Sequence, residues 1–237
     1  FLALYLLMAI GFKGGVALHR SGLTEAVLTL MAAGLFVATV IPLAAFVLLR
    51  LRLGTKDAAA IAAAYGSVSA VTFITAASLL EKIEIPYSGH MVAVMALMES
   101  PAIVTAVLLN RTFSTKGAAT VVSFRKTLHE AITNGSVFLL VGSLVIGFFS
   151  GEAGQNALRF FTEDLFKGML AFFLLDMGML AGRRMKDLRN CGWFLTLFAV
   201  AFPMLCAAAG VGIAVLLGLS VGDALLVTVL CAGASYI

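Results

Sequence analysis

A cluster of small and hydroxyl-bearing residues lies inside an otherwise apolar segment, 57–80. An alanine-rich run leads into Tyr65-Gly66-Ser67-Val68-Ser69 and then Thr72. Glycine and serine weaken helix continuity, and an interrupted helix leaves backbone amides unpaired. The N-terminus of a second half-helix presents N–H donors and a partial positive charge, which suits an anion. Gly66, Ser67 and Ser69 are therefore candidate anion-binding residues; the alternative is close packing of small residues between unbroken helices.

A second cluster repeats this pattern near the other end of the sequence. Cys231-Ala232-Gly233-Ala234-Ser235-Tyr236 matches the first cluster within a weak internal repeat of about 167 residues, in which Gly11 also falls on Gly178. Interrupted apolar segments at corresponding positions of two halves are a sequence signature of a transporter binding site near the middle of the membrane. We therefore add Ser235 and Tyr236 to the candidate anion site.

Ionisable residues inside apolar segments form the second candidate group. Glu99 precedes Ser100 and Pro101, and the proline frees a backbone carbonyl one turn earlier. A carboxylate, a hydroxyl and a free carbonyl are hard oxygen ligands, so Glu99 and Ser100, with the Thr72 hydroxyl, are candidate Na⁺ ligands, or part of a proton relay. Asp176 is a candidate coupling acid, because a lone charge at bilayer depth costs at least about 2.5–3.5 kcal/mol. The alternatives are a protonated or structural role for Glu99 and pairing of Asp176 with nearby arginines.

The composition indicates an all-α integral membrane protein. Hydrophobic residues make up 62% of the chain and charged residues 12%, against about 45–50% and about 25% in soluble domains. Apolar runs of about 18 or more residues predict membrane-spanning helices. Eight such spans are expected, at roughly 1–18, 24–53, 57–80, 90–110, 128–150, 163–182, 191–219 and 222–237. Lys13, within the first, is expected to extend its amine toward the membrane surface.

The repeat predicts two inverted halves with discontinuous helices. An odd number of spans in each period turns the second copy upside down in the bilayer. The first repeat is expected over 1–111, a polar and basic linker over 112–127, and the second repeat over 128–237. Because the chain begins and ends inside apolar runs, we expect the first helix of one repeat and the last of the other to be missing, so that about eight of ten spans are present.

Basic residues accumulate in alternate loops, which predicts the orientation. Lys and Arg favour cytoplasmic loops. One set of loops contains most of them: Arg50, Arg52, Lys56, Arg111, Lys116, Arg125, Lys126, Arg183, Arg184, Lys186 and Arg189. We expect these loops, including 112–127, to face the cytoplasm. The net charge of +4 then follows from the loops and requires no nucleic-acid partner.

Several short motifs resemble the sodium-dependent bicarbonate permeases of the SbtA type. They are Ile10-Gly11-Phe12-Lys13-Gly14-Gly15, Tyr65-Gly66-Ser67-Val68-Ser69, Ala77-Ser78-Leu79-Leu80-Glu81, Met98-Glu99-Ser100-Pro101-Ala102 and Met177-Gly178-Met179. The resemblance implies ten helices in two inverted five-helix repeats, a homotrimer, Na⁺-coupled bicarbonate uptake and substrate binding between two broken helices. It also implies a cytoplasmic regulator related to the signal protein PII.

The sequence thus predicts a bacterial inner-membrane Na⁺-dependent bicarbonate symporter that works by alternating access. Gly66, Ser67, Ser69, Ser235 and Tyr236 would bind the anion. Three alternatives stay open: a Na⁺- or H⁺-coupled carrier of another small organic anion, an anion channel, and a membrane-bound sensor. No Ser-His-Asp order, Gly-rich phosphate loop, HExxH or metal-ligand spacing occurs, so we predict no enzyme, no catalytic residue, and no cofactor other than Na⁺ as coupling ion.

Overall fold

The structure is a computed structural model, and it describes residues 1–22, 24–113, 135–185 and 192–235. The described chain is built from helices without strands. In order these are α1 (Leu2–Ser21), α2 (Glu25–Leu49), α3 (Thr55–Gly66), α4 (Ala70–Lys82), α5 (His90–Phe113), α7 (Gly135–Arg159), a π-helix η1 (Phe160–Asp164), α8 (Leu165–Arg184), α9 (Gly192–Leu216) and α10 (Val221–Ala232).

Length and apolarity confirm the all-α membrane class. Five helical stretches in the described chain are long and apolar enough to cross a bilayer, and one of them, Phe138–Arg184, contains both α7 and α8. Large apolar side chains point outward along them, among them Phe36, Phe149, Phe172 and Val215. An outward apolar surface of this extent is stable only against lipid or a partner protein. The protein is therefore a multi-pass membrane protein.

Three of the expected spans differ from single continuous helices. The span expected at 57–80 consists of two helices, α3 and α4, and α10 ends at Ala232 instead of continuing. The span expected at 128–150 corresponds to α7, which continues to Arg159 across a kink at Gly151 (φ 54°, ψ −142°). That backbone conformation belongs to the region that glycine reaches without a steric penalty. Residues 128–134 lie outside the described part of the chain.

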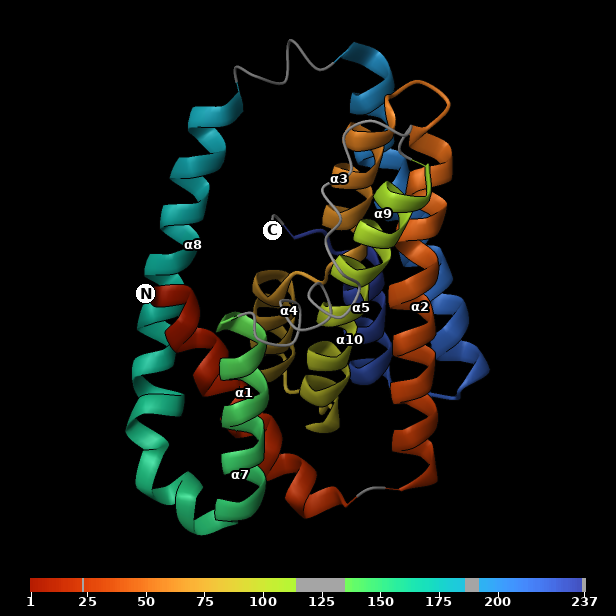
Figure 1. The fold of residues 1–237 in the computed structure, drawn as a ribbon. Coiled ribbons are helices and arrows are strands. Elements are labelled where there is room, and N and C mark those ends of the chain that lie inside the picture. The colour runs from red at the N-terminus through yellow and green to blue at the C-terminus, as the bar shows by residue number, and fades with distance from the viewer. Residues whose placement is uncertain (23, 114–134, 186–191, 236–237) are drawn as a thin grey trace.

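Corresponding helices of the two predicted repeats have equal lengths. α1 and α8 have 20 residues each, α2 and α9 have 25, and α3 and α10 have 12. The members of each pair run in opposite directions (Figure 1). Equal lengths and opposite directions support two inverted repeats; residues 114–127 of the predicted linker lie outside the described residues, and the division stays a prediction.

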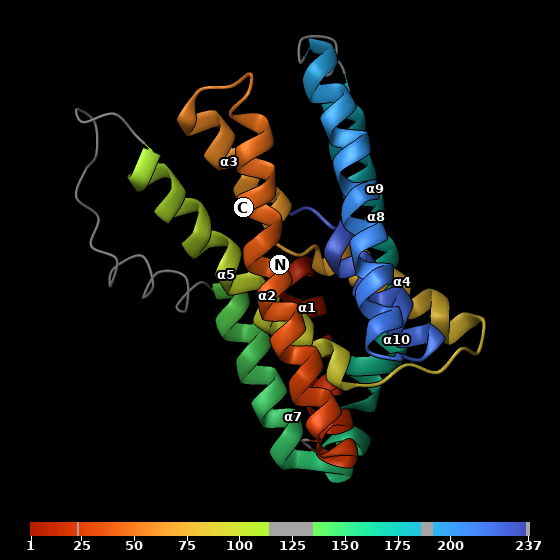
Figure 2. The ribbon, with the colours of Figure 1, turned by 90° about the vertical axis from the view of Figure 1, so that its right-hand side faces the viewer.

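The helix ends are sorted between the two ends of the molecule. The α2–α3 connection and the facing ends of α8 and α9 lie at the top of Figure 1. The α1–α2 connection and the α7–η1–α8 turn lie at the bottom, and the rotated view agrees (Figure 2). The α2–α3 connection and the end of α8 contain Arg50, Arg52, Arg183 and Arg184, which belong to the basic set that predicts the cytoplasmic side, so we refer to the bottom as the outer end.

Two groups of helices flank α4. On one side, α1 packs mainly on α7 and also touches α8, and both α1 and α7 contact α5 of the other group. On the other side α2 packs on α3 and α5, and α9 packs on α10. Contact between α1 and α7 is close because both are glycine-rich: a Cβ on Gly15 would lie 2.0 Å from the Leu144 carbonyl oxygen, and one on Gly147 would lie 2.2 Å from that of Phe12. Small residues permit this backbone approach in membranes.

Candidate substrate and ion site

The predicted helix break is present at Ser67-Val68-Ser69. Ser67 (φ −81°, ψ 132°) and Ser69 (φ −90°, ψ 102°) have extended backbones, and they separate α3 from α4. Ser67 is buried, with 4% of its surface exposed. The end of α3 is fixed against α2, because a Cβ on Gly66 would lie 2.7 Å from carbons of the Pro42 ring. Glycine at this position therefore brings the break into contact with the core.

Ser69 begins α4 as its N-cap. Its hydroxyl accepts a hydrogen bond from the Thr72 amide at 3.3 Å, and the Thr72 hydroxyl donates to the Ser69 carbonyl at 2.9 Å. The first amides of a helix have no acceptor within the helix. Those of Ala70 and Val71 therefore have no acceptor within α4, and they lie at the positive end of its dipole.

The end of α10 meets this break directly. Gly233 leaves α10 with an extended backbone, and the Ser235 amide then donates a 2.9 Å hydrogen bond to the Ala64 carbonyl of α3. A Cβ on Gly233 would lie 3.2 Å from the Ser69 nitrogen. The two interrupted segments are thus in backbone contact, although about 170 residues separate them in sequence. Tyr236, the remaining member of the predicted anion site, lies outside the described residues.

The four predicted cation and coupling residues are less closely grouped. Glu99 is half-buried in α5, whereas Asp176 is exposed on α8. In the described part of the chain, neither carboxylate has a hydrogen-bond partner. Thr72 is at the break, but its hydroxyl already bonds to Ser69, and the Ser100 side chain is not among those described. Thr72 therefore lies at the crossing, by which we mean the place where the Ser67–Ser69 break meets the end of α10, and the Na⁺ assignment stays a prediction.

Sequence reasoning missed a polar network near the outer end. The Lys13 amine lies 3.2 Å from Glu81 Oε1, and the Tyr87 hydroxyl donates to the same oxygen at 3.0 Å. Burial and the neighbouring carboxylate of Glu81 raise the pKa of Tyr87 well above its usual value, so its hydroxyl stays a donor. The Lys13 amine thus ties α1 to α4 near the outer end; its extension toward the membrane surface stays a prediction.

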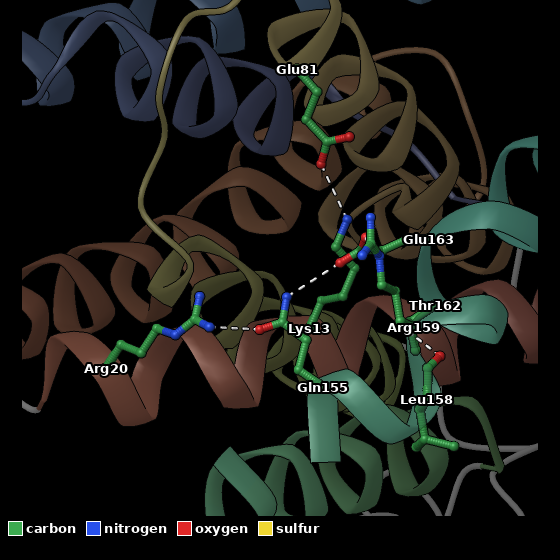
Figure 3. Close-up of polar contacts among 8 residues, drawn as sticks. All are labelled: Lys13, Arg20, Glu81, Gln155, Leu158, Arg159, Thr162 and Glu163. Carbon is green, nitrogen blue, oxygen red and sulfur yellow. Dashed lines mark hydrogen bonds and ion pairs between the residues drawn. The ribbon is translucent and has the colours of Figure 1, made fainter. Parts of the chain in front are cut away.

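A separate set of polar contacts joins α1 to α7 and η1 (Figure 3). Arg20 Nη2 donates to the Gln155 side-chain oxygen at 2.7 Å, and Gln155 Nε2 donates to Glu163 at 3.2 Å. Arg159 also bonds to Glu163, at 3.3 Å. The apolar context and the positions of Lys13 and Glu81 were visible in the sequence, but no local signal indicated that they pair across 68 positions.

A cavity of about 210 Å³ lies beside this network, between α1 and α4. Among the described residues, no group of three or more His, Cys, Asp or Glu side chains could hold a metal ion.

Interrupted helices that meet inside a multi-pass helical protein define the class as a membrane transporter. Within that class, the chain belongs to the Na⁺-dependent bicarbonate transporter superfamily, whose family model matches residues 1–237. This confirms the resemblance drawn from the sequence motifs and supports Na⁺ and bicarbonate as the transported ions. Membership in a transporter family also argues against an enzyme. No curated protein matches the chain.

Proposed function

We propose that the protein is a symporter that couples Na⁺ entry to bicarbonate uptake across the bacterial inner membrane by alternating access. The observation that carries the proposal is the contact between the break at Ser67–Ser69 and the extended end of α10. This contact supports a site to which the start of α4 would contribute amides and Ser67, Ser69 and Ser235 would contribute hydroxyls. Gly66 and Tyr236 complete the proposed anion site.

This arrangement suits bicarbonate for an electrostatic reason. Unpaired amides in lipid are tolerated only where protein, water or a ligand satisfies them. A small oxyanion accepts several hydrogen bonds at once, and the positive end of the α4 dipole offsets part of the loss of its hydration. A channel requires no such paired interruption, so the crossing favours a carrier over the channel alternative.

The coupling ion is proposed to bind where oxygen ligands are available in the interior. Glu99, Ser100 and the backbone carbonyl freed by Pro101 offer such ligands on α5, and Thr72 offers a hydroxyl at the crossing. A cation close to the anion lowers the electrostatic cost of holding either one away from water. In this scheme each ion favours binding of the other, which is the thermodynamic basis of coupling. Asp176 is kept as a candidate coupling acid on α8.

Alternating access is proposed to occur between the two helix groups that flank α4. The group of α1, α7 and α8 would rock against the group that contains α2, α3, α5, α9 and α10, around a fixed site. The Lys13–Glu81 ion pair lies between α1 and α4 and would have to open during the cycle. A homotrimer and a PII-like regulator on the cytoplasmic 112–127 loop complete the proposal; that loop lies outside the described residues.

The test is uptake of isotopically labelled bicarbonate into proteoliposomes at mildly alkaline pH. Uptake is measured with an inward Na⁺ gradient, with K⁺ in its place, and after a Na⁺ ionophore; CO₂ leaks equally in all three, so the difference reports the protein. We expect uptake that saturates and disappears without the gradient. Folded protein that shows no Na⁺-dependent uptake would overturn the proposal.

Two variants connect the uptake to the crossing. Ser69→Gly removes the hydroxyl and costs only a few tenths of a kcal/mol as an N-cap change, so we expect a folded protein with strongly reduced uptake. Thr75→Ala is the matched control, since the Thr75 hydroxyl bonds to the Val71 carbonyl of its own helix. Competition by other small anions tests the alternative substrate: inhibition by an organic anion at lower concentration than bicarbonate would favour it.

A further inference from the structure

The cavity between α1 and α4 extends from Ile74, near the crossing, toward the outer end. From α4 it is lined by Ile74, Ala77, Ser78 and Glu81, whose spacing of three and four residues places them on one helix face. Ile74 is four residues from Ala70, so the inner end of the cavity is about 6 Å, one helical turn, from the amides at the start of α4. The cavity therefore follows α4 from the proposed anion site toward the outer surface.

The opposite wall carries positive charge. α1 contributes Ile10, Lys13, Ala17 and Arg20 from one face. Lys13 and Arg20 are two turns apart on that face, and Glu81 is the only acidic residue in the cavity lining of the described chain. The volume of about 210 Å³ is many times the ~10–15 Å³ that one water molecule requires by the same measure. The space is sufficient for a small anion with part of its hydration shell.

Both cations keep donors beyond the bonds they make in the structure. An ammonium has three N–H donors and a guanidinium five. Lys13 uses one on Glu81, and Arg20 uses one on Glu152 and one on Gln155. Glu152 does not line the cavity and is largely exposed, with 71% of its side chain accessible, so solvent screens its effect. Ser78, Tyr87 and Gln155 add polar atoms to the lining without charge.

We propose that this cavity is a second anion-binding site, at which Lys13 and Arg20 collect a small inorganic oxyanion before it moves along α4 to the crossing. The site is distinct from the one at Ser67–Ser69. A cleft of one charge sign raises the local concentration of the oppositely charged ligand and its association rate, by about 10- to 1,000-fold in known cases. Glu81 lowers this attraction while it is paired with Lys13, because it neutralises the charge of Lys13.

The first experiment uses the opposite signs of Lys13 and Glu81. Lys13→Gln should raise the KM for bicarbonate uptake by about tenfold, the low end of the effect of charged clefts, whereas Glu81→Gln should lower it. Lys82→Gln is the control, because it also removes one positive charge. Lys82 follows Glu81, is exposed and does not line the cavity, so this variant should leave KM unchanged. If Lys13→Gln and Glu81→Gln change KM in the same direction, the pair acts only as a structural latch and the second site is wrong.

The second experiment does not depend on transport. Ser78→Cys places a thiol in the cavity wall, and its reaction rates with an anionic and a cationic methanethiosulfonate are compared in purified protein. The anionic-to-cationic rate ratio should fall several-fold when Lys13→Gln is added and rise with Glu81→Gln, and bicarbonate should slow the anionic reagent. Cys206 and Cys231 are buried, and the protein without the new cysteine gives the background.

The two experiments separate the proposals. A charge-dependent rate ratio without Na⁺-dependent uptake would keep the second anion site and overturn the proposed function. If the protein transports bicarbonate but Lys13→Gln leaves the anionic-to-cationic rate ratio unchanged, the second site alone would be overturned.

Discussion

The carboxylate of Asp223 accepts two hydrogen bonds from Ser88, 135 positions away: one from the backbone amide at 2.7 Å and one from the hydroxyl at 2.8 Å. Asp223 lies in the first turn of α10 and is only 6% exposed. Its own amide donates to the Ser220 N-cap. Close contact at Gly222, where a Cβ would lie 2.2 Å from the Pro86 carbonyl oxygen, adds to the connection. The loop between α4 and α5 is thus fixed to the start of α10.

We expect Asp223→Ala to lower the apparent melting temperature of the purified protein. Hydrogen bonds to a charged group contribute about 1.5–3 kcal/mol each, and the substitution leaves the Ser88 amide without its acceptor. Asp57→Ala is the matched control, because Asp57 occupies the corresponding position of α3 and is exposed. Its loss should cost only about 0.3–1 kcal/mol from the helix dipole. Equal losses for the two variants would contradict a specific role for the Asp223–Ser88 contact.

Two glycines that match in the internal repeat should differ in their tolerance of a methyl group. A Cβ on Gly11 would lie 2.1 Å from the Ser143 hydroxyl and 2.7 Å from the Leu140 carbonyl, whereas one on Gly178 would meet nothing within 4 Å. Gly11→Ala should therefore destabilise the α1–α7 contact by about 1–3 kcal/mol, as overpacking does. Gly178→Ala should leave the melting temperature unchanged or slightly raised. Thermal melting of both variants in the same detergent checks this: equal losses would favour the repeat equivalence over packing, and a reversed order would contradict the packing argument.

The helix break and its contact with Ser235 were predictable because a local cluster of small residues marks each of the two segments, and the internal repeat matches the clusters to each other. Gly66, Ser67 and Ser69 stand out against the apolar residues around them, and Ser235 stands out in the same way. An interrupted helix in lipid requires partners for its amides, and a matching interruption is the natural candidate. The locations of both clusters in the repeat therefore sufficed to predict that they meet.

The Lys13–Glu81 pair and the different surroundings of Gly11 and Gly178 could not be predicted in this way. Each depends on which helices are neighbours: α1 packs on α7 and approaches α4, whereas α8 is exposed over most of its length. Hydropathy and periodicity define which segments cross the membrane, but they do not specify lateral neighbours. The charge on Lys13 could be read from the sequence; its partner required the three-dimensional arrangement.

A disulfide should report the distance between the two interrupted helices. A Cβ on Gly233 would lie 3.5 Å from that of Ser69, within the range of about 3.5–4.5 Å that disulfides use. We expect Ser69→Cys with Gly233→Cys to cross-link under mild oxidation, identified by mass spectrometry of the linked peptides. In the control, Thr72→Cys with Gly233→Cys, the first cysteine lies three residues further along α4. This pair should not link efficiently. Linkage of the control pair alone would place the end of α10 elsewhere.

Na⁺ coupling should depend on Glu99 if α5 contributes to the cation site. Glu99→Gln preserves size and removes the negative charge, and a carboxylate is a much stronger Na⁺ ligand than an amide. In the proteoliposome assay we expect the Na⁺ concentration for half-maximal uptake to rise by about tenfold or more, equivalent to ~1.4 kcal/mol of lost Na⁺ affinity. Asp176→Asn is the comparison, because its carboxylate is exposed on α8. If Asp176→Asn shifts the Na⁺ dependence and Glu99→Gln does not, the cation site belongs to α8. If both variants shift it, both carboxylates act on Na⁺ binding, and the cation site is not confined to α5.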